Sequence, residues 1–275
     1  DTTPLAHLDS LQVEHLPAAR ASLRVAVVTE TYPPEINGVA RTLARLVGAL
    51  QERGHAVQLI RPRQAPDRLQ AGLRDPLEEV LVRGLPIPQY PHLRMGLPAK
   101  KALVAQWTLV RPDLVHIATQ GPLGWSALQA ARELRLPICT DFRTNFDAYS
   151  RHYGMGWLQK PIVAYLRKFH NQAQATTVPT EALKTTLEAN RFERLQVVAR
   201  GVDVASFNPG FRDPQLRAAW GAGESDCVAL YVGRLAAEKN LGLLARSFEA
   251  MKKANPRIRI VVVGDGPARA ELLAR

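Results

Sequence analysis

The sequence predicts an α/β fold with a doubly wound parallel sheet. Short runs rich in valine, isoleucine and leucine alternate with longer segments in which apolar residues recur at helical spacing. Strands separated by helices need crossover connections, and these connections make neighbouring strands parallel. The first unit of strand, helix and strand covers residues 23–29, 39–50 and 56–60, with Gly54 placed where a glycine often ends a helix.

The same alternation continues to residue 199, interrupted by a proline-rich and basic segment between Arg61 and Pro98. The remaining predicted strands cover residues 79–84, 112–117, 137–140, 176–178 and 195–199, and the predicted helices cover 124–134, 157–170 and 180–189. Residues 207–210 are typical of a linker. A second wound unit then begins with a strand from Val228, a helix from Leu241 and a strand over residues 258–263.

This pattern predicts three parts of the chain. We expect an N-terminal arm at residues 1–22, a Rossmann-like domain at 23–208 and the beginning of a second Rossmann-like domain at 209–275. Domains usually contain about 100–150 residues. The second domain is therefore expected to be incomplete and the chain to be truncated at its C-terminal end.

Composition indicates an ordinary globular protein. Hydrophobic residues make up 46% of the chain and charged residues 22%, and no apolar run reaches the ~18 residues of a membrane-spanning helix. The first residues lack a charged region followed by an apolar core, so no export signal is visible. Cys139 and Cys227 have no metal-ligand spacing, which favours buried thiols in a reducing compartment over a disulfide. We therefore expect a cytoplasmic protein.

The net charge of +11 indicates an anionic partner. Aromatic residues are only 6% of the chain and no arginine-rich run interleaves with them, so nucleic acid ranks below phosphates and lipid headgroups. Arg94, Lys100 and Lys101 flank apolar residues between Leu93 and Val104, and such a segment could rest on an anionic membrane surface. A solvated helix with a stripe facing the core is about twice as well supported by this pattern.

The most informative stretch connects Gly233, at the end of a predicted strand, to the helix that begins at Leu241. Arg234 and Lys239 lie five positions apart in this connection. Ligands of open α/β sheets bind beyond the carboxyl ends of the strands, and helix N-termini favour anions, so these two cations predict a diphosphate site. A solvated surface loop explains the spacing equally well.

Two other loops follow predicted strands. Residues 29–38 contain two adjacent prolines, and Gly38 stands at the start of a helix without the Gly-x-Gly-x-x-Gly pattern of a dinucleotide site. Hydride transfer is therefore disfavoured, while Gly38 fits a close ligand and a plain helix start about equally well. The Gly-Asp-Gly sequence at residues 264–266 again lets a ligand approach the backbone.

Five motifs occur in order along the chain. They are residues 31–39 (TYPPEINGV), 144–149 (TNFDAY), 200–203 (RGVD), 232–240 (VGRLAAEKN) and 264–267 (GDGP). In these motifs the chain resembles the retaining GT-B glycosyltransferases of family 4, and among them the bacterial mannosyltransferases and related enzymes that glycosylate membrane lipids. The resemblance covers residues 23–275 and implies a GT-B fold with two Rossmann-like domains.

The resemblance implies a role for each matching residue. Arg234 and Lys239 would hold the donor diphosphate and stabilise charge on the leaving nucleotide, which makes them catalytic in the electrostatic sense. The other expected donor-binding residues are Asn37, Gly38, Arg200, Gly233, Gly264, Asp265 and Gly266. The expected acceptor-side residues are Tyr32, Glu35, Asn145, Asp147 and Tyr149.

Two features depart from the family pattern. Arg143 stands before the Thr-Asn-Phe sequence, where the family often has histidine. Arginine cannot shuttle a proton at neutral pH but can bind phosphate or a sugar hydroxyl, so we place Arg143 among the catalytic residues. The family's acidic motif, a glutamate followed seven residues later by another, does not occur after Gly266. We expect the chain as given to bind nucleotide sugar weakly or not to turn over.

The expected function is retaining transfer of mannose or glucose from a nucleotide-diphosphate sugar, GDP-mannose or a UDP-sugar, to a lipid-linked or polyol acceptor at the cytoplasmic membrane face. No Asp-x-Asp pair occurs in the chain, which agrees with transfer that needs neither a metal nor a further cofactor. A nucleotide-sugar epimerase on the same two-domain plan is a rival. A non-catalytic module that binds a membrane surface or nucleotide sugars is an alternative that the basic charge favours, and nucleic-acid binding ranks last.

Overall fold

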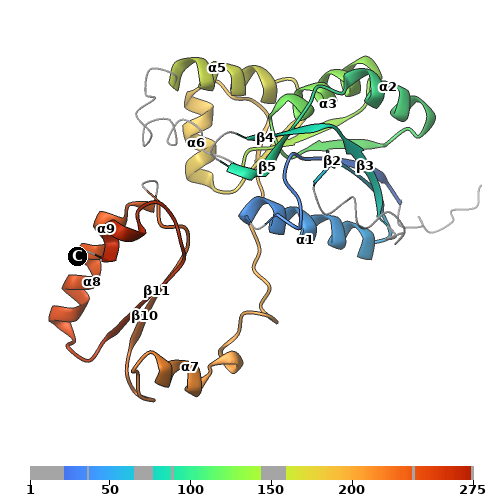
Figure 1. Cartoon of the computed structure of the whole chain (residues 1–275). Coiled ribbons are helices and arrows are strands. Elements are labelled where there is room, and N and C mark those ends of the chain that lie inside the picture. Colours follow the sequence, from blue (N-terminus) through green and yellow to red (C-terminus); the bar gives the residue numbers. More distant parts are fainter. Residues whose placement is uncertain are drawn as a thin grey trace, which may run out of the picture. The chain divides into compact units, whose positions relative to one another are not determined.

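The computed structural model of the chain describes residues 22–35, 37–64, 77–87, 90–143, 159–236 and 239–273 (Figure 1). The strands are β1 (Arg24–Val28), β2 (Ala56–Pro62), β3 (Glu78–Val82), β4 (Gly84–Ile87), β5 (Tyr90–Gly96), β6 (Leu114–Ile117), β7 (Ile138–Asp141), β8 (Ala175–Val178), β9 (Leu195–Val197), β10 (Val228–Val232) and β11 (Arg259–Val263). The helices are α1 (Gly38–Glu52), α2 (Lys100–Leu109), α3 (Pro122–Glu133), α5 (Gln159–His170), α6 (Glu181–Ala189), the 3-10 helix η3 (Pro209–Phe211), α7 (Pro214–Ala219), α8 (Leu241–Ala254) and α9 (Arg269–Leu273).

Seven strands form one large sheet in the order β3-β2-β1-β6-β7-β8-β9. Each neighbouring pair from β3 through to β8 is parallel. Helices connect most of these strands, as parallel pairing requires. The predicted α/β fold with a doubly wound parallel sheet is confirmed.

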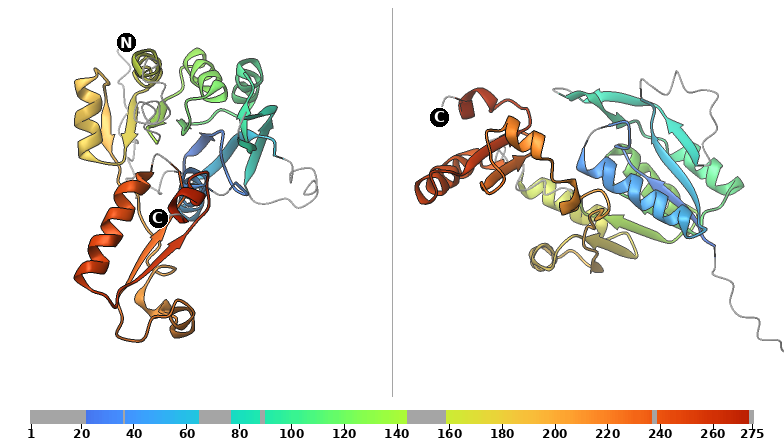
Figure 2. Two further views of the ribbon diagram at one scale, coloured as in Figure 1. Left: turned by 60° about the vertical axis from the view of Figure 1, so that its left-hand side comes forward. Right: turned by 90° about the horizontal axis from the view of Figure 1, so that it is seen from below.

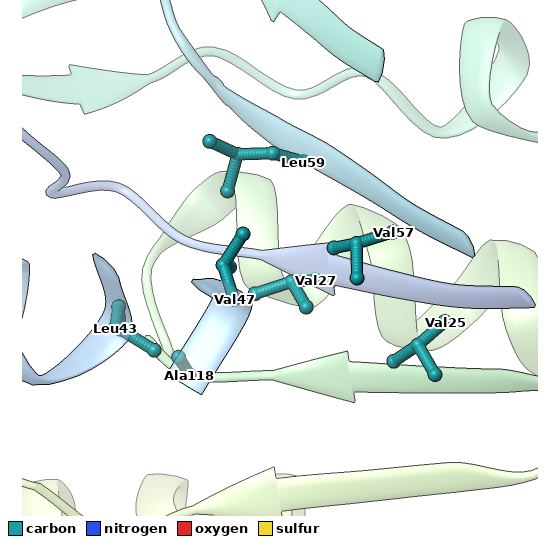
Figure 3. Close-up of a cluster of buried hydrophobic side chains, with 7 residues drawn as sticks. All are labelled: Val25, Val27, Leu43, Val47, Val57, Leu59 and Ala118. Carbon is teal, nitrogen blue, oxygen red and sulfur yellow. The ribbon is translucent and has the colours of Figure 1, made fainter. Parts of the chain in front are cut away.

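Side chains alternate between the two faces of the large sheet, and each face meets a different helix. One face packs on α1 in a cluster of Val25, Val27, Leu43, Val47, Val57, Leu59 and Ala118 (Figure 3). On the opposite face of β2, Gln58 Oε1 accepts a hydrogen bond from Trp107 Nε1 of α2 at 3.0 Å. Helix α1 therefore covers one face of the sheet and α2 covers the other, as Figure 1 shows.

Helix α1 begins and ends where its sequence supplies caps. The Asn37 side chain accepts a hydrogen bond from the Ala40 backbone N–H at 2.8 Å, which satisfies one of the free donors of the first turn. At the other end Gly54 has a φ of +83°, the left-handed conformation that follows many helices. The predicted helix over residues 39–50 and its end before Gly54 are both confirmed.

The segment from β4 to α2 differs from the prediction. Strands β4 and β5 form an antiparallel hairpin, which its prolines and basic residues did not indicate. Helix α2 begins at Lys100, and its Leu103 and Trp107 are buried. Of the two interpretations of this segment, a membrane-surface segment and a solvated helix with a stripe facing the core, α2 agrees with the second.

The chain divides into two compact units, Asp1–Asp141 with Asn171–Thr177 and Phe142–His170 with Val178–Arg275. In the second unit β10 and β11 pair in parallel, and α8 lies alongside them in both views of Figure 2. This strand, helix and strand arrangement confirms the second wound unit. The expected domain boundaries at residues 22 and 208 stay a prediction.

A buried histidine lies in the second unit beside an apolar cluster. The cluster consists of Phe142, Leu166, Val178, Leu187, Phe192 and Leu195. His170 is 1% exposed, and its ring centroid lies 5.1 Å from those of both Phe142 and Phe169. Burial lowers the pKa of His170 from 6.5 to about 3, because the charged ring would lose its hydration.

Substitution of a glycine inside α1 and of the glycine that follows its C-cap should change stability in opposite directions. Gly54 and Gly48 both have open space where a Cβ atom would stand, but only Gly54 has a positive φ. We expect Gly54→Ala to lower the free energy of unfolding by about 1 kcal/mol through backbone strain. Gly48→Ala, inside the helix, should raise it by up to ~1 kcal/mol. Urea unfolding measures both, and a Gly54→Ala variant as stable as wild type would contradict the cap.

His170 should make the folded chain sensitive to acid. The pKa of His170 is lower in the folded chain than in the unfolded chain. The contribution of His170 to the free energy of unfolding is therefore present above pH 6.5 and is lost as the pH falls toward 3. Between pH 7.5 and 5, we expect wild type to lose about 2 kcal/mol more than His170→Phe in free energy of unfolding. Nuclear magnetic resonance of the histidine ring gives an independent check, since a ring that titrates near pH 6 would contradict the burial argument.

Candidate functional site

Strands β1 and β6 form the switch point of the large sheet. The chain leaves β1 toward β2 and leaves β6 toward β7, and these neighbours lie on opposite sides of the β1–β6 pair. Open α/β sheets bind ligands beyond the carboxyl ends of their strands at such a point. The loop before α1 and the loop before α3 both start at this edge.

The loop between β1 and α1 is held together by its own polar side chains and by Gln64. Asn37 Nδ2 donates to Thr31 Oγ1 at 2.6 Å, and the Thr31 hydroxyl donates to the Glu35 carboxylate. Gln64 Nε2 donates to Glu35 Oε1 at 3.0 Å and to the Tyr32 carbonyl at 3.1 Å. Burial raises the pKa of Glu35, and these hydrogen bonds oppose the rise. Glu35, expected on the acceptor side, therefore braces this loop.

The other expected residues of this loop have different surroundings. Tyr32 packs against the apolar cluster between α1 and the sheet, and Asn37 caps α1. Gly38 is exposed, and no atom lies within 4 Å of the place where a Cβ atom would stand. Packing within the protein does not require a glycine at this position, and the open space admits a ligand close to the backbone.

Glu30 is a further residue at this edge, and the sequence analysis did not single it out. The backbone N–H of Leu123 donates to Glu30 Oε1 at 3.0 Å, and the backbones of Gly96 and Gly124 also bond to the carboxylate. Burial raises the pKa of Glu30 from 4.5 to about 7, although these hydrogen bonds oppose the rise. An acidic residue directly after a buried strand, at the ligand-binding edge of a sheet, was the signal that could have found it.

In the second unit, the loops after β10 and β11 are joined backbone to backbone. The Leu235 N–H donates to the Asp265 carbonyl at 2.9 Å, and the Ala268 N–H donates to the Leu235 carbonyl at 3.0 Å. A Cβ atom on Gly264 would lie 1.9 Å from the Gly233 carbonyl oxygen, and one on Gly266 would lie 2.3 Å from the Leu235 carbonyl oxygen. Close approach of the two loops therefore explains these glycines without a ligand.

The two predicted cations lie on this joined loop. Arg234 and Lys239 are both exposed. The Tyr231 hydroxyl donates to the Arg234 carbonyl at 3.1 Å, so the backbone that carries the guanidinium is fixed. Lys239 precedes Asn240, whose side chain accepts from the Leu243 N–H and caps α8. The structure thus places Arg234 on a backbone held by the neighbouring loop and Lys239 directly before the cap of α8.

The structure describes three further predicted site residues of this unit, Arg143, Arg200 and Asp265. Arg200 Nη2 donates to the Arg143 carbonyl at 3.3 Å, so these two predicted residues lie together. Arg143 directly follows Phe142, which is 3% exposed in the apolar cluster. Asp265 is exposed, and its Oδ1 accepts from the Gly266 N–H at 2.8 Å. Three expected acceptor-side residues, Asn145, Asp147 and Tyr149, lie outside the described residues.

The described residues bear on two further expectations, the absence of a metal site and the absence of a membrane-spanning helix. Within those residues, histidine, cysteine and acidic side chains form no group of three that could hold a metal ion. None of the described helices combines the length and the apolar character that crossing a membrane takes. Two of the cations considered for a membrane surface contact the protein itself: Lys100 pairs with Glu133 at 2.8 Å, and Arg94 donates to the Gly84 carbonyl at 3.2 Å.

Comparison with known proteins gives the family of the chain. Residues 36–206 match the family described as Glycosyltransferase Family 4, and residues 213–275 match the family described as Glycosyl transferases group 1. The chain belongs to Glycosyltransferase Family 4. The resemblance carried by the five sequence motifs is thereby confirmed.

Relatives of this family 4 chain are longer than the chain itself. A GDP-mannose-dependent alpha-mannosyltransferase of Mycolicibacterium smegmatis is 33% identical over 258 residues, which cover 91% of this chain and 65% of that protein. An alpha-monoglucosyldiacylglycerol synthase of Streptococcus pneumoniae is 25% identical, with coverages of 89% and 56%. The crystal structure of a glycosyltransferase from Rickettsia africae matches with a TM-score of 0.63 at 16% identity, over 92% of this chain and 63% of that one. This likeness supports the GT-B fold.

The two loop glycines should differ in what they contribute to stability. At Gly264 an alanine would force its Cβ atom into the Gly233 carbonyl at a φ of +153°, so we expect Gly264→Ala to lower the free energy of unfolding by about 3 kcal/mol. At Gly38 the space is open, and we expect Gly38→Ala to change it by less than ~0.5 kcal/mol. Urea unfolding of both variants is the measurement, and equal losses would contradict the packing explanation.

Proposed function

We propose that the chain is part of a retaining hexosyltransferase that moves mannose or glucose from a nucleotide-diphosphate sugar to a lipid-linked or polyol acceptor. Family membership makes sugar transfer the expected chemistry. The names of the relatives indicate the substrates, because one uses GDP-mannose and another makes a glucosyldiacylglycerol. GDP-mannose is the favoured donor, since the 33% identical relative depends on it.

The observation that carries the proposal is the pair of cations on the joined loop of the second unit. Arg234 and Lys239 are both exposed. Hydrogen bonds to the neighbouring loop and to Tyr231 hold the backbone at Arg234 and Leu235, and the Lys239 N–H donates to the Ala236 carbonyl at 2.9 Å. When the sugar–phosphate bond breaks, negative charge grows on the departing diphosphate. Cations already fixed in place stabilise that charge without a reorganisation cost, which lowers the barrier to bond cleavage. They would do this without a metal ion.

Retention of configuration follows from the chemistry of the favoured donor. Mannose in GDP-mannose is α-linked, and the relative's name describes an alpha-mannosyltransferase. A transfer from an α-linked donor to an α-linked product keeps the configuration at the anomeric carbon. We extend the same stereochemistry to this chain.

A lipid acceptor places the proposed enzyme at a membrane surface. The net charge of +11 favours contact with anionic lipid, and the β4–β5 hairpin exposes Leu85 and Met95 at 52% and 37%. Lys101 is exposed on α2, which follows the hairpin in the chain. We propose peripheral association with the cytoplasmic face of the membrane through this basic and apolar region.

Donor binding should depend on Arg234 and Lys239. We expect titration calorimetry to detect binding of GDP-mannose or UDP-glucose to the chain, and the double variant Arg234→Ala, Lys239→Ala to weaken it by about a hundredfold, since two charged hydrogen bonds are lost. The matched control is Arg246→Ala, Lys253→Ala, which removes the same charge from exposed positions on α8. The control should bind as wild type does.

Three results would contradict the proposal in different ways. Equal weakening in the double variant and the control would mean that net charge, not the two named cations, attracts the nucleotide. Binding to anionic vesicles without binding or transfer of any nucleotide sugar would favour a non-catalytic membrane-surface module. Interconversion of free nucleotide sugars without transfer would favour an epimerase.

A further inference from the structure

The carboxylate of Glu30 joins three separate segments of the first unit. Its Oε1 accepts from the Leu123 N–H at 3.0 Å, and the backbones of Gly124 on α3 and Gly96 on β5 also bond to the carboxylate. Its own backbone N–H donates to Thr119 Oγ1, after β6, at 2.9 Å. Glu30 thus ties the loop after β1 to the start of α3 and to the end of β5.

The surroundings of Glu30 are shaped around its carboxylate. A Cβ atom on Gly121 would lie 2.1 Å from Glu30 Oε1, so only glycine leaves room for it there. A glutamine has one accepting oxygen with two lone pairs, and its amide nitrogen only donates. A glutamine at position 30 would therefore leave at least one of the three backbone N–H groups without its acceptor. Three donors need both oxygens of the carboxyl group.

In the part of the chain that the structure describes, no cation is among the groups that shift the pKa of this partly buried carboxyl group. Burial is the largest cause of the raised pKa, and backbone hydrogen bonds are the opposing ones. The described titratable and charged side chains on the neighbouring segments are Arg94 on β5, His116 on β6, Arg132 and Glu133 on α3, and Glu35 on the same loop. Arg94 donates to a carbonyl on β4, His116 lies within β6, Arg132 and Glu133 end α3, and Glu35 has its own partners.

A continuous path of bonds leads from Glu30 to the start of α1. Glu30 is followed by Thr31, whose hydroxyl accepts from Asn37 Nδ2 at 2.6 Å. Asn37 caps α1 by accepting from the Ala40 N–H, and Gly38 is the next residue. A shift of Glu30 relative to α3 would therefore pass through Thr31 to the residues expected at the donor.

We propose that Glu30 is a positioning residue for sugar transfer: its carboxylate ties the start of α3 to the loop after β1 and so sets where Asn37 and Gly38 lie. This inference rests on the proposed function. Glu30 acts through the loop and does not itself contact the sugar. Its role differs from those of Arg234 and Lys239, which bind the donor through their own charges.

The tie has a defined dependence on pH. In the tied state the carboxyl binds a proton up to about pH 7, whereas a carboxyl exposed by opening of the loop would release it near pH 4.5. The equilibrium constant for opening of the loop therefore rises with pH between about 4.5 and 7, by up to about tenfold per pH unit. Above pH 7 it no longer changes. The protection of the Leu123 and Gly124 amides against hydrogen exchange should therefore fall by the same factor per pH unit and become constant above pH 7.

Hydrogen exchange tests the tie directly, on the wild-type chain, on Glu30→Gln and on the matched control Glu52→Gln, which changes an exposed glutamate at the end of α1. We expect pH-dependent protection at Leu123, Gly124, Ala40 and Arg41 in wild type and control. In Glu30→Gln the protection should be lower at pH 5.5 and no longer follow this pH dependence. Unchanged protection at Ala40 and Arg41 in Glu30→Gln would overturn the positioning role. Glu30 would then hold only the residues that it contacts directly and would not affect the start of α1.

Donor binding and transfer separate this inference from the proposed function. If wild type binds or transfers a nucleotide sugar, Glu30→Gln should weaken donor affinity or slow transfer by about tenfold, with its pH dependence near 7 removed. Unchanged binding, rate and pH profile would overturn the inference alone. If neither the wild-type chain nor a version extended to a complete second domain binds or transfers a nucleotide sugar, the proposed function fails. In that case the inference, as a statement about sugar transfer, fails with it, and the exchange data still report whether Glu30 holds the loop.

Discussion

The parallel pairing of β1 with both β2 and β6 is the constraint on which the first unit depends. It places the carboxyl ends of β1 and β6 side by side and sends the following connections to opposite sides of the sheet. The apolar face of α1 then packs on Val25, Val27, Val57 and Leu59, and this burial holds α1 with its first turn at that edge. The polar loop before α1 can be fixed there because both of its ends belong to the core.

The second unit fixes its loops by a different device. Strands β10 and β11 form a sheet of two strands, and the segments that follow them exchange backbone hydrogen bonds. Gly264 and Gly266 permit this contact because any side chain would collide with a carbonyl oxygen. The glycines therefore place Arg234 indirectly, by fixing the backbone on which it stands. A motif of glycines near cations can thus be explained by the packing of two loops, without a ligand touching a glycine.

Much of this arrangement could be predicted from the sequence, and the failures have physical reasons. Helix α1 was predictable because its apolar spacing, Asn37 cap and final Gly54 all agree on one structure. The β4–β5 hairpin was missed because its sequence has neither regular alternation nor a short turn signal. Glu30 was missed because its partners are backbone N–H groups of Gly96, Leu123 and Gly124, distant in sequence. Backbone donors leave no pattern in side chains.

In both units, side chains of the protein itself occupy N–H groups at the start of a helix. In the first unit the start of α3 is already occupied, because the Leu123 and Gly124 N–H groups bond to the internal carboxylate of Glu30. A phosphate cannot use these donors without displacing that carboxylate. In the second unit the Asn240 side chain takes up the Leu243 N–H at the start of α8. In the proposed enzyme, attraction of a diphosphate would therefore fall mainly to the charged side chains of Arg234 and Lys239, because side chains of the protein itself already use these helix N-terminal donors.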